Sequence, residues 1–279
     1  MNFACTQWTR APRQVPEGRT LFAIGDVHGH ADELIALRAL IRNEIDANPG
    51  VSSVVVYLGD YIDRGPDSKR VLETLSAGIG GAAEEVFLVG NHDQFLIELL
   101  NLDPDLDLRF MDTWYQNGGS ATMLSLQVDG YGRLLQDGDL AQLSARAHAA
   151  LGADLVGFLM RLATVHRAGE YVFVHAGIDP AQDLDNQSFV DLLMMREPFL
   201  SARHGWRHSF CVVHGHSISM PSVLRHRIGV DAGCYQHGAL CAVQLKGDRL
   251  RFLGATRIPD YPWNERLGGK TGEWRWSAA

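Results

Sequence analysis

The chain has 279 residues, of which 46% are hydrophobic and 21% charged, and its formal net charge is −8. This composition is typical of a globular protein, and the acidic balance excludes the global positive field that attracts nucleic acid or an anionic membrane surface. No apolar run reaches the roughly 18 residues of a membrane-spanning helix, so we expect no nucleic-acid partner and no membrane partner.

The first half of the chain alternates strand and helix patterns. Residues 1–19, with two prolines and a glycine near their end, predict an irregular lead-in. Residues 20–25 (TLFAIG) and 53–59 (SVVVYLG) predict buried strands. Residues 31–48 carry leucine and isoleucine at helical spacing and end at Pro-Gly, and residues 69–76 predict a second helix.

A third strand (EVFLVG, 85–90) and a helix starting at residue 91 continue the pattern. This βαβαβα order is typical of an α/β fold. Residues 101–165 differ, because their patterns are mostly helical, and they predict a helical insertion lying over the sheet.

The second half returns to strands. Residues 239–255 predict an antiparallel hairpin around Gly247-Asp248. We therefore expect one domain over residues 20–255 and a peripheral tail over 256–279. Three further strands precede the hairpin: 171–177 (YVFVHAG), 210–216 (FCVVHGH) and 227–233 (RIGVDAG).

The four cysteines lack the CxxC spacing of metal and redox sites, and three of them lie in apolar, strand-like segments. A free cysteine in such a place behaves as a small hydrophobe. We therefore expect reduced thiols and a cytoplasmic location. The N-terminal residues also lack a hydrophobic signal core.

Five predicted strands end in a polar motif: in chain order GDVHG, GDYIDRG, GNHD, HAG and HGHS. Ligands of open α/β sheets bind outside the carboxyl ends of strands, where such loops converge. Taken singly, each polar residue has an ordinary explanation as a cap, a turn or a core histidine. Together they predict a metal site with three oxygen and three imidazole donors, which suits a pair of Mn, Fe or Zn ions. The six candidate ligands are Asp26, His28, Asp60, Asn91, His175 and His214.

The series GDVHG…GDYIDRGPDS…GNHD…HAG…HGH resembles the phosphoprotein phosphatase family of the calcineurin-like metallophosphoesterases. The segments WYQNGG, REPFL and VDAGCYQHGAL are most similar to those of bacterial serine/threonine-phosphatase-like members. The resemblance covers residues 20–255 and implies a four-layer fold, in which a two-sheet β-sandwich is flanked by helices. It also implies two divalent cations, with Mn²⁺ expected and Fe or Zn as alternatives. One would be held by Asp26, His28 and Asp60, and the other by Asp60, Asn91, His175 and His214, with Asp60 as the bridge.

The residue types match this chemistry. Two metal ions lower the pKa of a shared water, and the resulting hydroxide can attack phosphorus. His92 is the candidate acid for the leaving group, and Asp63 is its orienting carboxylate, as the family also implies. Arg64 and Arg196 are candidate phosphate ligands because a guanidinium matches phosphate oxygens in a bidentate manner. Asn91 is expected to contact the phosphate as well.

Three functions are compatible with the sequence, and the first of them is the one that we expect. The first is a phosphoserine/phosphothreonine protein phosphatase, which Asp63 favours because the dinucleotide hydrolases that this chain otherwise resembles usually lack that aspartate. The alternative is a hydrolase of symmetrical dinucleoside tetraphosphates or another small phosphate ester, which Asp93 favours because many protein phosphatases carry glutamate there. The third is a non-catalytic metal-binding module. The oligomeric state and the native metal stay open, and His216 is a possible supporting residue without a predicted role.

Overall fold

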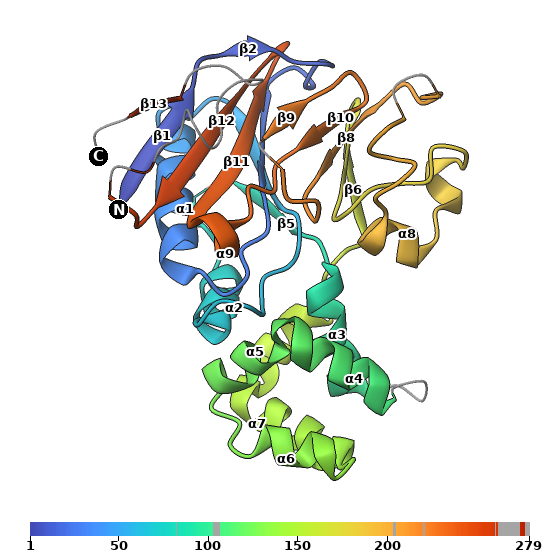
Figure 1. The fold of residues 1–279 in the computed structure, drawn as a ribbon. Coiled ribbons are helices and arrows are strands. Elements are labelled where there is room, and N and C mark those ends of the chain that lie inside the picture. The colour runs from blue at the N-terminus through green and yellow to red at the C-terminus, as the bar shows by residue number, and fades with distance from the viewer. Residues whose placement is uncertain are drawn as a thin grey trace.

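The computed structural model describes residues 1–81, 83–102, 107–202, 205–219, 221–259, 261 and 274–276. Two β-sheets pack against each other in the upper part of Figure 1, and a group of helices extends below them. The mixed α/β fold with two sheets flanked by helices agrees with the fold class expected from the sequence.

The larger sheet has eight strands in the order β13-β1-β12-β11-β3-β4-β5, with β2 beside β12. Its β3, β4 and β5 are parallel neighbours, whereas β11 pairs antiparallel with both β3 and β12. The predicted hairpin is therefore confirmed. The strands are β1 (Asn2–Thr6), β2 (Thr9–Arg10), β3 (Arg19–Ile24), β4 (Ser52–Tyr57), β5 (Glu84–Phe87), β11 (Ala239–Lys246), β12 (Arg249–Thr256) and β13 (Trp274–Trp276).

The smaller sheet has five strands in the order β6-β7-β8-β10-β9. Its three central strands run parallel, so that their carboxyl ends share one edge. The strands are β6 (Val165–Ala168), β7 (Tyr171–Val174), β8 (Cys211–His214), β9 (Ser222–Val223) and β10 (Arg227–Gly229).

Burial on both faces explains why residues 54–57 of β4 are apolar at every position. Val54 and Val56 pack between the two sheets, together with Phe173 and Val213 of the smaller sheet. Val55 and Tyr57 point the other way and join the core under the helices. A parallel strand covered on both faces needs apolar residues at every position, and this burial fixes the loop after β4 in place.

The helices cover the outer faces of the sheets. Those of residues 91–159 are largely the green group in the lower part of Figure 1. The helices are α1 (Ala31–Asp46), α2 (Ser68–Ser76), α3 (Asn91–Asn101), α4 (Leu108–Trp114), a π-helical turn (Tyr115–Gly119), α5 (Ser120–Ser125), α6 (Tyr131–Gln136), α7 (Leu140–Leu159), a 3₁₀ turn (Leu184–Asn186), α8 (Phe189–Met194) and α9 (Cys234–His237).

The N-terminal residues differ from the expected irregular lead-in. Residues Asn2–Thr6 form β1, which pairs antiparallel with β12. The prolines and glycine that suggested a loop all follow residue 11, whereas the first residues can complete the open edge of the sheet. Most of the predicted tail lies outside the described residues, but β13 pairs with β1.

The four cysteines are free thiols, as expected. Within the described part of the chain, no helix combines the length and the apolar character needed to cross a membrane.

Candidate functional site

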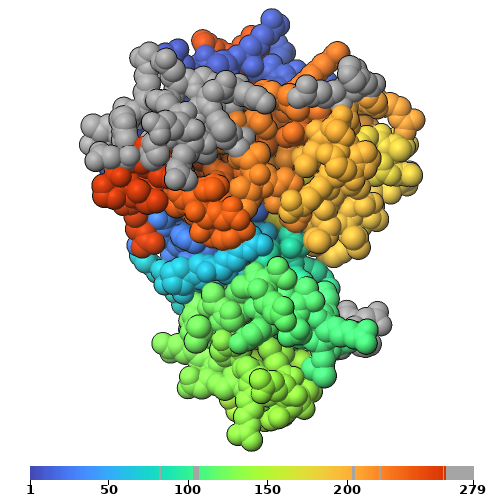
Figure 2. Space-filling model, in the orientation of Figure 1, coloured from blue at the N-terminus to red at the C-terminus, as the bar shows by residue number. Residues whose placement is uncertain are grey.

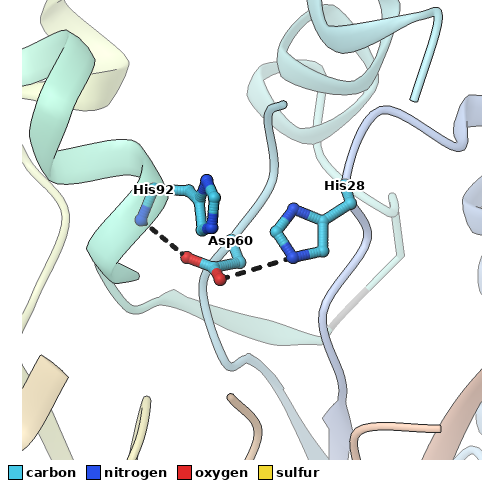
Figure 3. A group of neighbouring side chains, drawn as sticks. All are labelled: His28, Asp60 and His92. Atoms are coloured by element: carbon cyan, nitrogen blue, oxygen red, sulfur yellow. Dashed lines mark hydrogen bonds and ion pairs between the residues drawn. The ribbon is translucent and has the colours of Figure 1, made fainter. Parts of the chain in front are cut away.

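Asp60 lies at the centre of the site, in the loop that follows β4. Its Oδ2 is 3.5 Å from Nε2 of His28, and its Oδ1 is 3.5 Å from Nε2 of His175. Figure 3 shows the Asp60 carboxylate between the rings of His28 and His92. Because its two oxygens face different imidazoles, this carboxylate has the arrangement that a bridge between two cations requires.

The two histidines that face Asp60 are held in the form that binds metal. Nδ1 of His28 is 2.9 Å from the carbonyl oxygen of Ile62, and Nδ1 of His175 is 2.8 Å from that of Leu58. A proton on Nδ1 leaves the Nε2 lone pair directed at the site. Burial lowers the pKa of both rings, to about 3 for His28, so that both are neutral near pH 7.

Two further predicted residues join this group. Asn91 is the first residue of α3, and its Oδ1 is 3.0 Å from Nε2 of His175. The buried carboxylate of Asp26, after β3, accepts a hydrogen bond from the backbone N–H of His216. Burial and the charges of Asp231 and Asp60 raise the pKa of Asp26, and the positive charge of bound cations would oppose that rise.

His214 differs from the other predicted ligands, because the structure places it outside the group. Its Nδ1 is 3.0 Å from the carbonyl oxygen of Gly215, and its Nε2 is 3.3 Å from a guanidinium nitrogen of Arg227. The ring also packs edge-on against Phe199. Both nitrogens thus face protein groups on the far side of β8, and the His214 ligand prediction does not fit this geometry.

His216 occupies the place expected of His214. One ligand atom from each of His216, His175 and Asp60 lies within 4.8 Å of the other two. Nε2 of His216 is buried and has no hydrogen-bond partner among the described residues, and burial lowers the pKa of this ring to about 3. A buried, neutral and unpartnered imidazole nitrogen beside a carboxylate is a good fit for a metal ion.

Asp93 supports the loop that carries Asp60. Its carboxylate accepts hydrogen bonds from the backbone N–H groups of Asp60, Tyr61 and Gly90, at 2.8, 2.9 and 2.9 Å. Burial, followed by the charge of Asp60, raises the pKa of Asp93 to about 8. A Cβ added to Gly90 would lie 2.2 Å from Oδ1 of Asp60, so only glycine allows this close approach.

Backbone strain is concentrated at the site. Seven described residues other than glycine have a positive φ, and five of them belong to these loops. Such conformations cost of order 1–3 kcal/mol each and persist where the surroundings impose them. The five are His28, Asp60, Asp63, Arg64 and His216, with φ between 45° and 74°.

The predicted acid and its orienting carboxylate are in direct contact. Nδ1 of His92 is 2.6 Å from Oδ2 of Asp63, and both side chains are buried. Burial lowers the pKa of His92, but Asp60 and the hydrogen bond to Asp63 outweigh it, so that the pKa is raised overall. A raised pKa favours the protonated ring, which is the form that a proton donor requires.

Two residues that the sequence did not single out hold Asp63 in place. Nε1 of Trp114 donates to Oδ2 of Asp63 at 2.7 Å, and Oγ1 of Thr122 donates to Oδ1 at 2.6 Å. The Thr122 hydroxyl also accepts from the N–H of Asp63. The helical region therefore contributes directly to the orientation of His92.

The Thr122 contact predicts a kinetic effect. Replacing Thr122 with valine removes both hydrogen bonds to Asp63 at nearly constant volume, and a hydrogen bond to a charged group contributes about 1.5–3 kcal/mol. We expect kcat on an alkyl phosphate to fall about ten-fold, with metal content unchanged. Thr122→Ser, which keeps the hydroxyl, should retain most of the activity. Equal kcat values for the two variants would show that this contact does not orient the acid.

The two predicted phosphate ligands line one cavity of about 680 Å³ together with Asp60, Asn91 and His92. The guanidinium nitrogens of Arg64 lie 3.0 Å from Nε2 of His28 and 2.8 Å from Nε2 of His92. Its carbon lies 4.2 Å from the ring centre of Tyr235, a cation–π contact. Arg196 is exposed and reaches the same cavity.

Gly118 of the π-helical turn fixes the backbone of Arg64. Its carbonyl accepts the Arg64 N–H at 3.2 Å. Its φ is 115°, and a Cβ added there would lie 2.7 Å from the Arg64 backbone nitrogen. Gly118 in WYQNGG thus permits a close contact between the helical region and the β4 loop.

Comparison with known proteins gives one family match. The sequence profile of the calcineurin-like phosphoesterases matches residues 19–241. The chain is 25% identical over 266 residues to the zinc-dependent endopolyphosphatase of Saccharomyces cerevisiae, covering 81% of this chain and 75% of that protein. It is 26% identical over 228 residues to the asymmetrical bis(5'-nucleosyl)-tetraphosphatase PrpE of Bacillus velezensis, covering 76% and 83%.

A solved structure described as a putative diadenosine tetraphosphatase has a similar fold. Its TM-score is 0.58 at 21% sequence identity, and the match covers 88% of this chain and 97% of that one. The two folds correspond along nearly all of the smaller chain.

Proposed function

The chain belongs to the calcineurin-like phosphoesterases, and we propose that within this family it is a metal-dependent hydrolase of dinucleoside polyphosphates. The proposed metal ligands are Asp26, His28, Asp60, Asn91 and His175 from the sequence-predicted set, with His216 in place of His214.

One observation carries the proposal. Arg64 and Arg196 line the same cavity as Asp60 and Asn91, and the volume of this cavity, about 680 Å³, is in the range of small-molecule sites. A polyphosphate carries several negative charges along its length, so it needs cationic groups at more than one point. The names of relatives support the same substrate class, since one is a bis(5'-nucleosyl)-tetraphosphatase and another an endopolyphosphatase.

The residues of this chain have separate tasks in the proposed reaction. When bound, the divalent ions would bind phosphoryl oxygens and lower the pKa of a water. Arg64 and Arg196 hold the remaining phosphate oxygens and orient the bond to be broken. His92, fixed by Asp63, can donate a proton to the leaving oxygen, although an anhydride needs this proton less than an alkyl ester does.

A phosphoserine/phosphothreonine protein phosphatase is the second candidate, and the His92–Asp63 pair favours it. A serine or threonine alkoxide is a poor leaving group and needs a proton, whereas a nucleotide phosphate leaves readily without one. A hydrogen bond of 2.6 Å between His92 and Asp63 is thus more valuable to a phosphomonoesterase than to an anhydride hydrolase.

A substrate panel tests the choice. Because the donor set suits Mn, Fe and Zn alike, each metal should be added to metal-stripped protein with diadenosine tetraphosphate or a phosphothreonine peptide. We expect kcat/KM to be at least about ten-fold higher for the dinucleotide, and chelation to lower both rates roughly a thousand-fold. Faster hydrolysis of the peptide with every metal would overturn the dinucleotide proposal and favour the second candidate.

A further inference from the structure

Part of the active-site cavity is lined by apolar side chains. Phe189, Val190 and Met194 of α8 line it with exposed fractions of 43%, 65% and 52%. Phe95 of α3 and Phe110 of α4 line it as well. These five residues are referred to as the apolar wall. In Figure 2 the gold surface that includes α8 lies directly above the green surface that includes α3 and α4.

The exposure of α8 is unusual within this protein. Three of the twelve large hydrophobic side chains that are exposed among the described residues belong to this six-residue helix. Scattered apolar side chains are normal on a protein surface, but a cluster at a cavity marks a binding site.

The apolar wall lies next to the reacting groups. The ring centre of Phe95 is 6.4 Å from that of His92 and 4.4 Å from that of Phe110. Phe95 also stacks on Trp114, which donates to Asp63. A ring bound against Phe95 would therefore lie one side chain away from the predicted acid.

Polar groups border the apolar wall on the α3 side. Gln94, Glu98, Thr113 and Asn117 line the same cavity, and Nε2 of Gln94 donates to Oε1 of Glu98 at 3.0 Å. Amide and carboxylate side chains match the donors and acceptors on the edge of a base. The negative charge of Glu98 disfavours a phosphate beside it, whereas the guanidinium groups of Arg64 and Arg196 favour one.

We propose that the apolar wall binds one nucleobase of the substrate. This inference rests on the proposed dinucleotide activity. Stacking on aromatic rings suits a flat, polarisable base. Cationic, aromatic or apolar, and polar side chains all line this single cavity, and the phosphate, the base face and the base edge of a nucleotide need these three kinds of partner. The nucleobase subsite accounts for recognition beyond the phosphate chain.

Alanine variants of α8 test the subsite, because their exposed side chains can be removed without opening a core cavity. For Phe189→Ala and Met194→Ala we expect KM for diadenosine tetraphosphate and the inhibition constant of ADP to rise about ten-fold. The inhibition constant of inorganic pyrophosphate, which has no base, should not change. Leu124→Ala is the matched control, since Leu124 is 67% exposed on α5 and does not line the cavity.

The outcomes separate the subsite from the proposed function. The first outcome is that the wild type hydrolyses the dinucleotide, but in both variants the inhibition constants of ADP and pyrophosphate change equally or not at all. This outcome would overturn the subsite alone. The second outcome is that the wild type hydrolyses only a phosphothreonine peptide, and the α8 variants raise KM for a peptide with an apolar residue next to the phosphothreonine. This outcome would overturn both the subsite and the dinucleotide activity, and it would assign the apolar wall to peptide binding. A wild type inactive on the dinucleotide with every metal, and not inhibited by ADP, would also overturn both.

Discussion

Asparagine in place of His216 should remove about half of the bound metal and lower kcat/KM roughly a thousand-fold, whereas asparagine in place of His214 should leave both nearly unchanged. The His216 ring faces His175 and Asp60 with a buried, unpartnered nitrogen. Asparagine tolerates the left-handed backbone at this position, where φ is 59°, but its side chain is too short to reach the same ligand position.

His214→Asn is the matched control. An asparagine amide can still donate to the Gly215 carbonyl oxygen, as Nδ1 of His214 does. The loss of the contact with Arg227 should cost stability of about 1–3 kcal/mol, which thermal unfolding would report. Metal content by elemental analysis and kcat/KM should be measured on all three proteins. Loss of metal in His214→Asn with full metal content in His216→Asn would restore the assignment that the sequence suggested.

The two histidines show where sequence patterns stop being informative. His214 is the last residue of β8, and residues two apart in a strand point to the same side. That rule fails here because the chain leaves the strand at Gly215, and His216 adopts a positive φ. The motif HGH thus predicts a histidine ligand after β8, but only the turn geometry decides which histidine faces Asp60.

The support of Asp63 shows a different limit. Trp114 and Thr122 are 51 and 59 residues from Asp63 in the sequence. Such a contact leaves no local periodicity, so the helical pattern of this region predicted helices but not their contact with the β4 loop. The available signal was the glycine pair at Gly118 and Gly119, since glycines often mark close backbone approach.

The strand-end residues were predictable for a simple reason. The strands β3 and β4 are buried beyond their first residue, and β5 continues into the buried Leu88 and Val89. The first polar residues after these segments therefore mark the sheet edge. Asp26, Asp60 and Asn91 all follow strands of the larger sheet in this way. Their positions therefore follow from the pattern, while their roles as ligands stay predictions that metal analysis can check.

Asparagine in place of His92 should separate the substrate classes. The variant keeps a polar side chain at the cavity but cannot donate a proton to a leaving group. General acid catalysis contributes about 10²–10⁴-fold, so kcat on a phosphothreonine peptide should fall by that factor. A p-nitrophenyl ester or a dinucleotide, whose leaving group is already stable as an anion, should lose only about ten-fold.

Metal content decides how the His92 result is interpreted. His92 lies close to His28 and Asp60, so a variant that lost metal would fail on every substrate alike. Full metal content with a large loss on the peptide and a small loss on the activated ester would identify His92 as the acid. Equal losses on both esters at full metal content would contradict that role, because the need for a proton differs between the two leaving groups. In that case the 2.6 Å contact with Asp63 would serve to position a group that binds phosphate, and the main argument for a phosphomonoesterase would be lost with it.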